Sequence, residues 1–278
     1  MFNLKQYLSI PHASILRRAL VVTAITLTLS PAAMANVQVT VNIQNLAPTN
    51  SVSFTPLNLG FHQGIFDSFN IGQAANAALI PLAEVGNGSA WQSAFAAADP
   101  TATLGTIGGA LLPGQSLSAS FTVDPTLNQY FTFASMVLPS NDFFIGNDSP
   151  TRYQLFDDAG NLQIAQITQT ARQIWDAGSE LFDPTTGAFI AGVDGSLSNP
   201  QNSVVTFNFA ELAALNGLTT AAGYIFNSNL AADTEIYRIS FTVSPVPEPQ
   251  TVAMLLIGLL IVGATLTRQR TENNLAAA

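Results

Sequence analysis

The chain has 278 residues, no cysteine and a formal net charge of −9 at pH 7. Residues 36–250 contain no lysine, and their three arginines against sixteen acidic residues give this segment a net charge of about −13. A protein that binds nucleic acid needs a basic face, so this balance excludes that class of function. The missing cysteines exclude thiol catalysis and disulfides, although a segment of this length can bury a stable core without them.

The first 35 residues have the three-part pattern of a secretory signal peptide. Basic residues come first, then an uncharged and mostly apolar run over residues 19–30, then a small-x-small sequence that ends at Ala35. Signal peptidase recognises this order, so we expect cleavage after Ala35 and export of a chain that begins at Asn36. A buried N-terminal helix of a cytosolic domain is the alternative. The basic residues are Lys5, Arg17 and Arg18.

Six segments of the exported region have the pattern of β-strands. Residues 37–43 alternate strictly between apolar and polar side chains, which indicates a strand with one buried face. The others are rich in aromatic and β-branched residues, with turn-forming Gly, Pro, Asn and Asp between them. The predicted strands span residues 37–43, 51–59, 121–123, 130–138, 203–209 and 235–243.

Helical pattern is scarce in the same region. Residues 73–84 are rich in alanine and predict a short helix interrupted by Pro81, and residues 210–216 predict another. Many short strands with turns between them are typical of an antiparallel β-sandwich. We therefore predict one all-β domain over residues 36–244.

Few residues of the exported region suit catalysis. His12 belongs to the signal peptide, which leaves His62, and no nucleophile elbow, phosphate loop or zinc-protease motif is present. A hydrolase would draw on His62, Asp67 and Glu84, or on a carboxylate pair whose spacing the sequence does not reveal. A structural role for His62 is the interpretation that we favour.

Two loops with acidic residues are candidates for a metal site. Asp142 follows the predicted strand 130–138, and Asp176 and Glu180 stand four residues apart across Gly178. A sharp turn at this glycine would let both carboxylates face one point. Three carboxylates with main-chain carbonyls and water suit Ca²⁺, at distances of ~2.3–2.6 Å, better than zinc, because no His or Cys is nearby. Two ordinary polar loops are the alternative.

The C-terminal end has a second three-part pattern, in which a Pro-Glu-Pro motif, an uncharged apolar segment and a basic tail follow one another. The apolar segment is close to the minimum length of a helix that crosses a membrane. The basic residues after it favour a cytoplasmic tail. A plain single-pass anchor would have the same pattern. The linker spans residues 245–250 with Pro247, Glu248 and Pro249, the predicted transmembrane helix residues 251–267, and the tail residues 268–278.

This arrangement resembles the PEP-CTERM sorting signal. The resemblance implies recognition by exosortase, a membrane enzyme that cleaves its substrates near the motif. It also implies a Gram-negative bacterium that secretes exopolysaccharide and forms biofilms. The protein would be held in the inner membrane and then reach the cell surface or the extracellular matrix.

The two acidic loops resemble the signature loops of the spondin domain, which occurs in matrix proteins of the F-spondin type and in bacterial secreted proteins. Pro139-Ser-x-Asp-aromatic-aromatic-x-Gly is the first loop, and Trp175-Asp-Ala-Gly-x-acid is the second. The resemblance, which extends over residues 37–243, implies a C2-like β-sandwich with calcium bound by Asp142, Asp176 and Glu180. The chain departs from animal members in having Glu180 in place of aspartate and in lacking their cysteines.

These features together predict a non-enzymatic binding or matrix module that is exported and sorted. Its expected partners are signal peptidase, exosortase and exopolysaccharide or other matrix components. Two alternatives stay open at this point. One is a secreted hydrolase that acts on matrix polymer, and the other, by analogy with the C2-like fold alone, is a calcium-dependent lipid-binding module.

Overall fold

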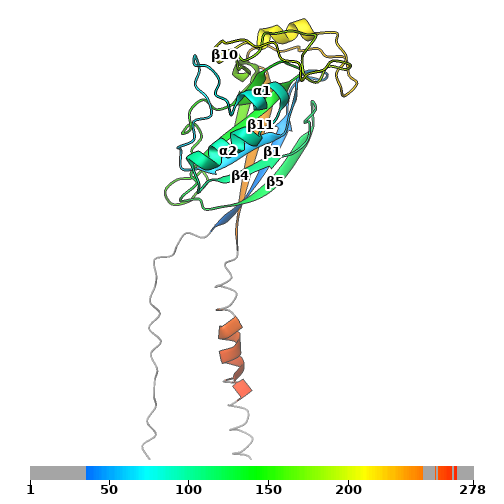
Figure 1. Ribbon diagram of the computed structural model, residues 1–278. Coiled ribbons are helices and arrows are strands. Elements are labelled where there is room, and N and C mark those ends of the chain that lie inside the picture. The colour runs from blue at the N-terminus through cyan, green and yellow to red at the C-terminus, as the bar shows by residue number, and fades with distance from the viewer. Residues whose placement is uncertain (1–35, 247–253, 255, 265, 268–278) are drawn as a thin grey trace, which may run out of the picture. The chain divides into compact units, whose positions relative to one another are not determined.

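The computed structural model describes residues 36–246, 254, 256–264 and 266–267. The predicted signal peptide with its expected cleavage site at Ala35, the Pro247-Glu248-Pro249 motif and the basic tail at residues 268–278 lie outside this part of the chain. The described residues after 246 are helical (Figure 1). A search of the described residues for a helix with the length and hydropathy of a membrane span finds none.

Two antiparallel β-sheets form the main part of the structure, as predicted. The first has the strand order β5 (Ser116–Val123), β1 (Val37–Asn45), β11 (Glu235–Pro245) and β8 (Gln166–Thr170). The second has the order β10 (Thr206–Phe207), β9 (Trp175–Asp176), β7 (Phe143–Gly146), β6 (Tyr130–Leu138), β3 (Leu57–His62) and β4 (Thr103–Ile107), and β2 (Ser53–Phe54) also pairs with β6.

The main hydrophobic core lies between the two sheets. Side chains on one face of β1, such as Val39 and Val41, are buried in this core. Successive side chains of a strand point to opposite faces, so those between them point toward solvent. Aromatic rings join the sheets: Phe131 of β6 packs edge-on against Phe241 of β11 with centroids 4.9 Å apart. Two antiparallel sheets that share a core in this way are consistent with a β-sandwich.

A second apolar cluster covers the opposite face of the larger sheet. It includes Trp91 and Phe95 of α2 (Ser89–Ala98), Leu82 of α1 (Ile80–Val85) and Phe144 of β7. Both helices are visible in Figure 1. Because core residues contact both faces of β6, eight of its nine residues are buried, which explains why residues 130–138 do not alternate in polarity.

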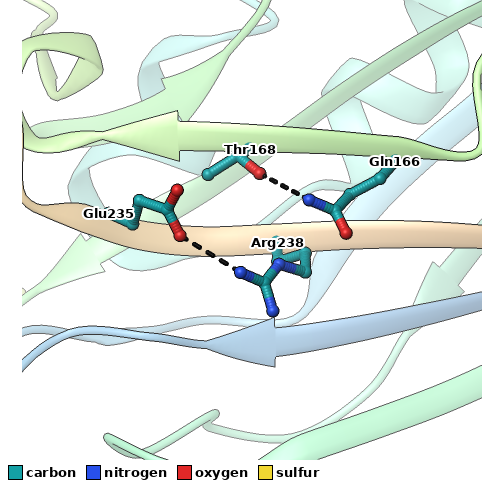
Figure 2. A network of polar contacts seen from close by, with 4 residues as sticks. All are labelled: Gln166, Thr168, Glu235 and Arg238. Carbon is teal, nitrogen blue, oxygen red and sulfur yellow. Dashed lines mark hydrogen bonds and ion pairs between the residues drawn. The ribbon is translucent and has the colours of Figure 1, made fainter.

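The outer face of the four-stranded sheet is polar. Figure 2 shows Arg238 paired with Glu235 at 3.1 Å on β11, and the Gln166 amide donating a hydrogen bond of 3.1 Å to the Thr168 hydroxyl on β8. These side chains are partly or fully exposed, which agrees with a solvent-facing surface. The charge pair sits at the surface, so its contribution to stability is small.

Most of the predicted strands are confirmed, and four predictions need correction. Of the helix predicted over residues 73–84, only the part from Ile80 onward is helical, in α1. Residues 51–59 form two strands, which break at Pro56 because proline lacks an N–H for the ladder. Only Thr206–Phe207 of the predicted strand 203–209 is extended in a sheet. Residues 210–216 form a 3₁₀ helix, η2 (Phe209–Leu215), and a further 3₁₀ turn, η1 (Ala171–Gln173), precedes β9.

Candidate functional site

Asp142 lies in the turn between β6 and β7 and is only 2% exposed. Its Oδ2 accepts hydrogen bonds from the main-chain N–H groups of Ser179, at 2.8 Å, and Glu180, at 3.0 Å. The Ser179 hydroxyl donates a third at 3.2 Å. Among the described residues none donates to Oδ1, so one oxygen of this buried carboxylate lacks a protein donor.

Asp176 reaches the same end of the sheet because β7 pairs with β9, which sets Phe143 opposite Asp176. Its Oδ1 accepts a hydrogen bond of 2.7 Å from the N–H of Gly178, and its Oδ2 accepts one of 3.2 Å from the Asn208 amide. The turn after Asp176 requires glycine. Gly178 has φ +67°, and a Cβ there would lie 2.8 Å from the carbonyl oxygen of Val204.

The two aspartates interact electrostatically. Burial raises the pKa of Asp142, and the nearby negative charge of Asp176 raises it further, to about 7, against the hydrogen bonds that favour the charged form. Within the described part of the chain, the one ion pair found joins Arg238 to Glu235, far along the sequence from this loop. A bound cation would supply the missing positive charge.

The Glu180 side chain belongs to a different group of residues. Its carboxyl interacts with the polar side chains of Ser198 and Asn141, which favour the charged form, and with the charge of Glu84 on α1. Burial is the largest cause of its raised pKa, and the repulsion from Glu84 adds to it. The structure therefore brings Asp142 and Asp176 together, while Glu180 joins them through its main-chain N–H.

A search of the described residues finds no group of three or more His, Asp or Glu side chains that is arranged to hold a metal ion. Calcium at Asp142, Asp176 and Glu180 therefore stays a prediction. The donors that fit it are the free Oδ1 of Asp142 and the Asp176 carboxylate, since both are hard oxygen ligands. Beside them, a hollow of about 320 Å³ is lined by Glu84, Ser179 and Ser198, among others.

His62 is fully buried in β3, which is consistent with the structural role that we favour. Its Nε2 is 3.0 Å from the Thr132 hydroxyl, and its Nδ1 accepts a hydrogen bond of 3.1 Å from the N–H of Gly64. Burial lowers the pKa of His62 to about 4, although the charge of Asp99 opposes this shift. Asp67 instead binds the Asn70 amide at 2.8 Å, so the hydrogen bonds of the described residues link His62 to neither Asp67 nor Glu84.

The association of Glu84 with Glu180 was missed by sequence reasoning. The two residues are far apart in the chain, and no spacing rule connects a helix residue with a later loop. The sequence holds one indirect signal. Glu84 is the single charged residue of the alanine-rich segment 73–84.

Comparison with models of known protein families finds no match for this chain, and a search of curated protein sequences finds none either. The resemblances to the spondin domain and to the PEP-CTERM signal therefore stay predictions that rest on the residues quoted for them.

Proposed function

We propose that this protein is an exported, non-enzymatic binding module of the cell surface or extracellular matrix, with a C2-like sandwich of spondin type that binds calcium. The observation that carries the proposal is the buried Asp142 beside the half-buried Asp176, whose negative charge raises the pKa of Asp142, while no ion pair among the described residues involves either carboxylate. Calcium would neutralise the pair and join the start of β7 to the turn after β9. Its role would then be structural.

The two ends of the chain support the same proposal. The signal peptide pattern would direct export, and the Pro-Glu-Pro motif with the following apolar segment and arginines would direct processing by exosortase. The strongly acidic exported region, with its missing cysteines, suits a soluble extracellular domain that depends on its core and a metal rather than on disulfides. Matrix exopolysaccharide is the partner that this sorting route suggests.

Thermal unfolding with calcium and with a chelator tests the calcium site. We expect calcium to raise the melting temperature of the wild type, because a ligand that binds only the folded state stabilises it. The double variant Asp142→Ala, Asp176→Ala should lose this shift. The matched control Asp158→Ala, Asp233→Ala removes two exposed aspartates and the same charge, and it should keep the shift. An equal shift in all three proteins would refute the assignment.

A hydrolase that acts on matrix polymer is the second candidate, and one observation favours it. Glu84 lines the hollow of about 320 Å³, and the neighbouring Glu180 has a raised pKa. Two neighbouring carboxyl groups can supply the acid and the base of a hydrolysis reaction. Release of reducing ends from matrix polymer, lost in Glu84→Gln but kept in Glu211→Gln, would support the hydrolase.

Co-sedimentation with liposomes, with and without calcium, would test the lipid-binding alternative.

A further inference from the structure

A second hollow, of about 310 Å³, lies on the larger sheet beside β9 and β10. It is separate from the carboxylate pair, because its lining comes from the end of β7, the loop that follows, and the aromatic residues of β9 and β10. The residues on which the argument rests are Trp175, Phe207, Asp148, Arg152, Tyr153 and Gln173.

Two stacked aromatic rings form one side of this hollow. Phe207 pairs with Trp175 in the β9–β10 register, and their rings stack with centroids 3.8 Å apart and planes at 26°. Trp175 is 5% exposed and belongs to the second apolar cluster, whereas Phe207 is 47% exposed. Since Trp175 covers one face of the Phe207 ring, the exposed surface is its other face and edge. A flat apolar ligand face would bury this surface.

Polar groups at the same hollow have unused hydrogen-bonding capacity. Arg152 is exposed, makes no ion pair among the described residues, and lies with its guanidinium carbon 5.9 Å from the centre of the Tyr153 ring. Gln173 uses its Oε1 to accept from the N–H of Thr170, which leaves its amide group to donate. Asp148 accepts one hydrogen bond of 3.3 Å, from the N–H of Ile71.

One buried donor is also without a partner. The indole Nε1 of Trp175 is inaccessible and makes no hydrogen bond among the described residues. A buried N–H without an acceptor is costly, and native proteins satisfy nearly all of them with protein, water or ligand oxygens. Trp175 lines the hollow, but its Nε1 is inaccessible, so this donor does not itself contact a ligand there.

We propose that this hollow binds a pyranose ring of a polysaccharide. A pyranose has an apolar C–H face that stacks on an aromatic ring, and hydroxyl groups at its edge that both donate and accept hydrogen bonds. Phe207 would take the apolar face, Arg152 and Gln173 would donate to hydroxyl or carboxylate oxygens, and Asp148 would accept from hydroxyls. The inference rests on the proposed function, because it names the ligand class and the place where the module would bind it.

The test is binding of defined oligosaccharides to the full-length chain, measured by calorimetry. One probe is a neutral β-glucan oligosaccharide and the other is an oligogalacturonate, which separates a neutral ligand from an acidic one. We expect wild type to bind at least one of them. Phe207→Ala should weaken that binding by about tenfold, which corresponds to about 1.4 kcal/mol, because it removes the ring on which the sugar would stack.

Two further variants keep the test decisive. Phe207→Tyr retains the ring and should retain binding. Ile225→Ala removes an apolar side chain that is 53% exposed and does not line this hollow, so this variant should bind as wild type does. Oligosaccharide binding that Phe207→Ala leaves unchanged would overturn this inference but not the proposed function. Binding of neither probe, together with no retention of wild type by matrix polymer, would overturn both.

Discussion

The main-chain N–H of Glu180 donates a hydrogen bond of 3.0 Å to the carboxylate of Asp142, while the carboxyl of Glu180 interacts with Glu84 instead. The two acidic loops are therefore joined by hydrogen bonds within the protein itself. The Ser179 donors add to the same link. Because these bonds need no metal, we expect the fold to persist in the presence of a chelator.

The turn after Asp176 gives a prediction with a matched control. Gly178 and Gly72 both have positive φ, +67° and +76°, but a Cβ at Gly178 would meet main-chain atoms, whereas nothing lies within 4 Å at Gly72. Gly72→Ala should lower the free energy of unfolding by about 1–2 kcal/mol, through backbone strain. Gly178→Ala should lower it by a further ~1–3 kcal/mol, because the turn must shift. Urea denaturation measures both, and equal losses would contradict the prediction.

The repulsion between Glu84 and Glu180 gives a second prediction. Glu84→Gln removes the negative charge that helps to raise the pKa of Glu180, so that pKa should fall, though burial will keep it above the ordinary value. Titration of the Glu180 carboxyl by NMR measures the change. Glu211→Gln on η2 is the control and should leave the titration as it is in wild type. A Glu180 titration that Glu84→Gln does not alter would refute the assigned contact.

The strands were predictable where burial imposes a simple pattern on the sequence. β1 alternates because it has one buried and one solvated face, and β6 shows no such alternation because both of its faces are covered. The helices were less predictable. Residues 73–79 are not helical, since the Asn76 side chain accepts hydrogen bonds from the N–H groups of Ala78 and Leu79 and so forms a local turn before α1.

α2 was missed because its signal is weak. Its first residues have no side-chain cap, and only Trp91 and Phe95, one turn apart, are buried. For the candidate site, the closeness of Asp142 to residues 176–180 was predicted from the resemblance to the spondin loops, because the glycine turn concerns only Asp176 and Glu180. The direction of the Glu180 side chain was not, because it depends on Ser198 in a later loop and on Glu84 in α1. Such long-range contacts leave no spacing in the sequence.

The pH dependence of stability gives a third prediction, for protein kept free of metal with a chelator. The pKa of Asp142 is about 7 in the folded chain against 3.8 for a free carboxyl. The folded chain therefore binds the Asp142 proton more tightly than the unfolded chain does. Its stability falls as pH rises from 3.8 to about 7. The loss is on the order of 4 kcal/mol. In Asp142→Asn the free energy of unfolding should fall less over the same pH rise than it does in wild type. Urea denaturation at each pH measures it, and equal falls in the two proteins would contradict the prediction.

His62 gives a fourth prediction, with the opposite sign. Its pKa is about 4 in the folded chain against 6.5 for a free histidine. The unfolded chain therefore binds the proton more readily, so this contribution to stability is complete above pH 6.5 and is lost as pH falls through about 4. The difference corresponds to about 3 kcal/mol.

His62→Gln keeps hydrogen-bonding groups at this position but does not titrate. Between pH 6.5 and 4 the wild type should therefore lose more stability than the variant, as measured by urea denaturation at each pH. Identical losses would show that the imidazole is not held neutral by burial. The same variant tests whether His62 takes part in hydrolysis, because a hydrolase that used it would lose its activity at neutral pH. A binding module would keep its affinity there, since the histidine lies inside the core and is fully buried.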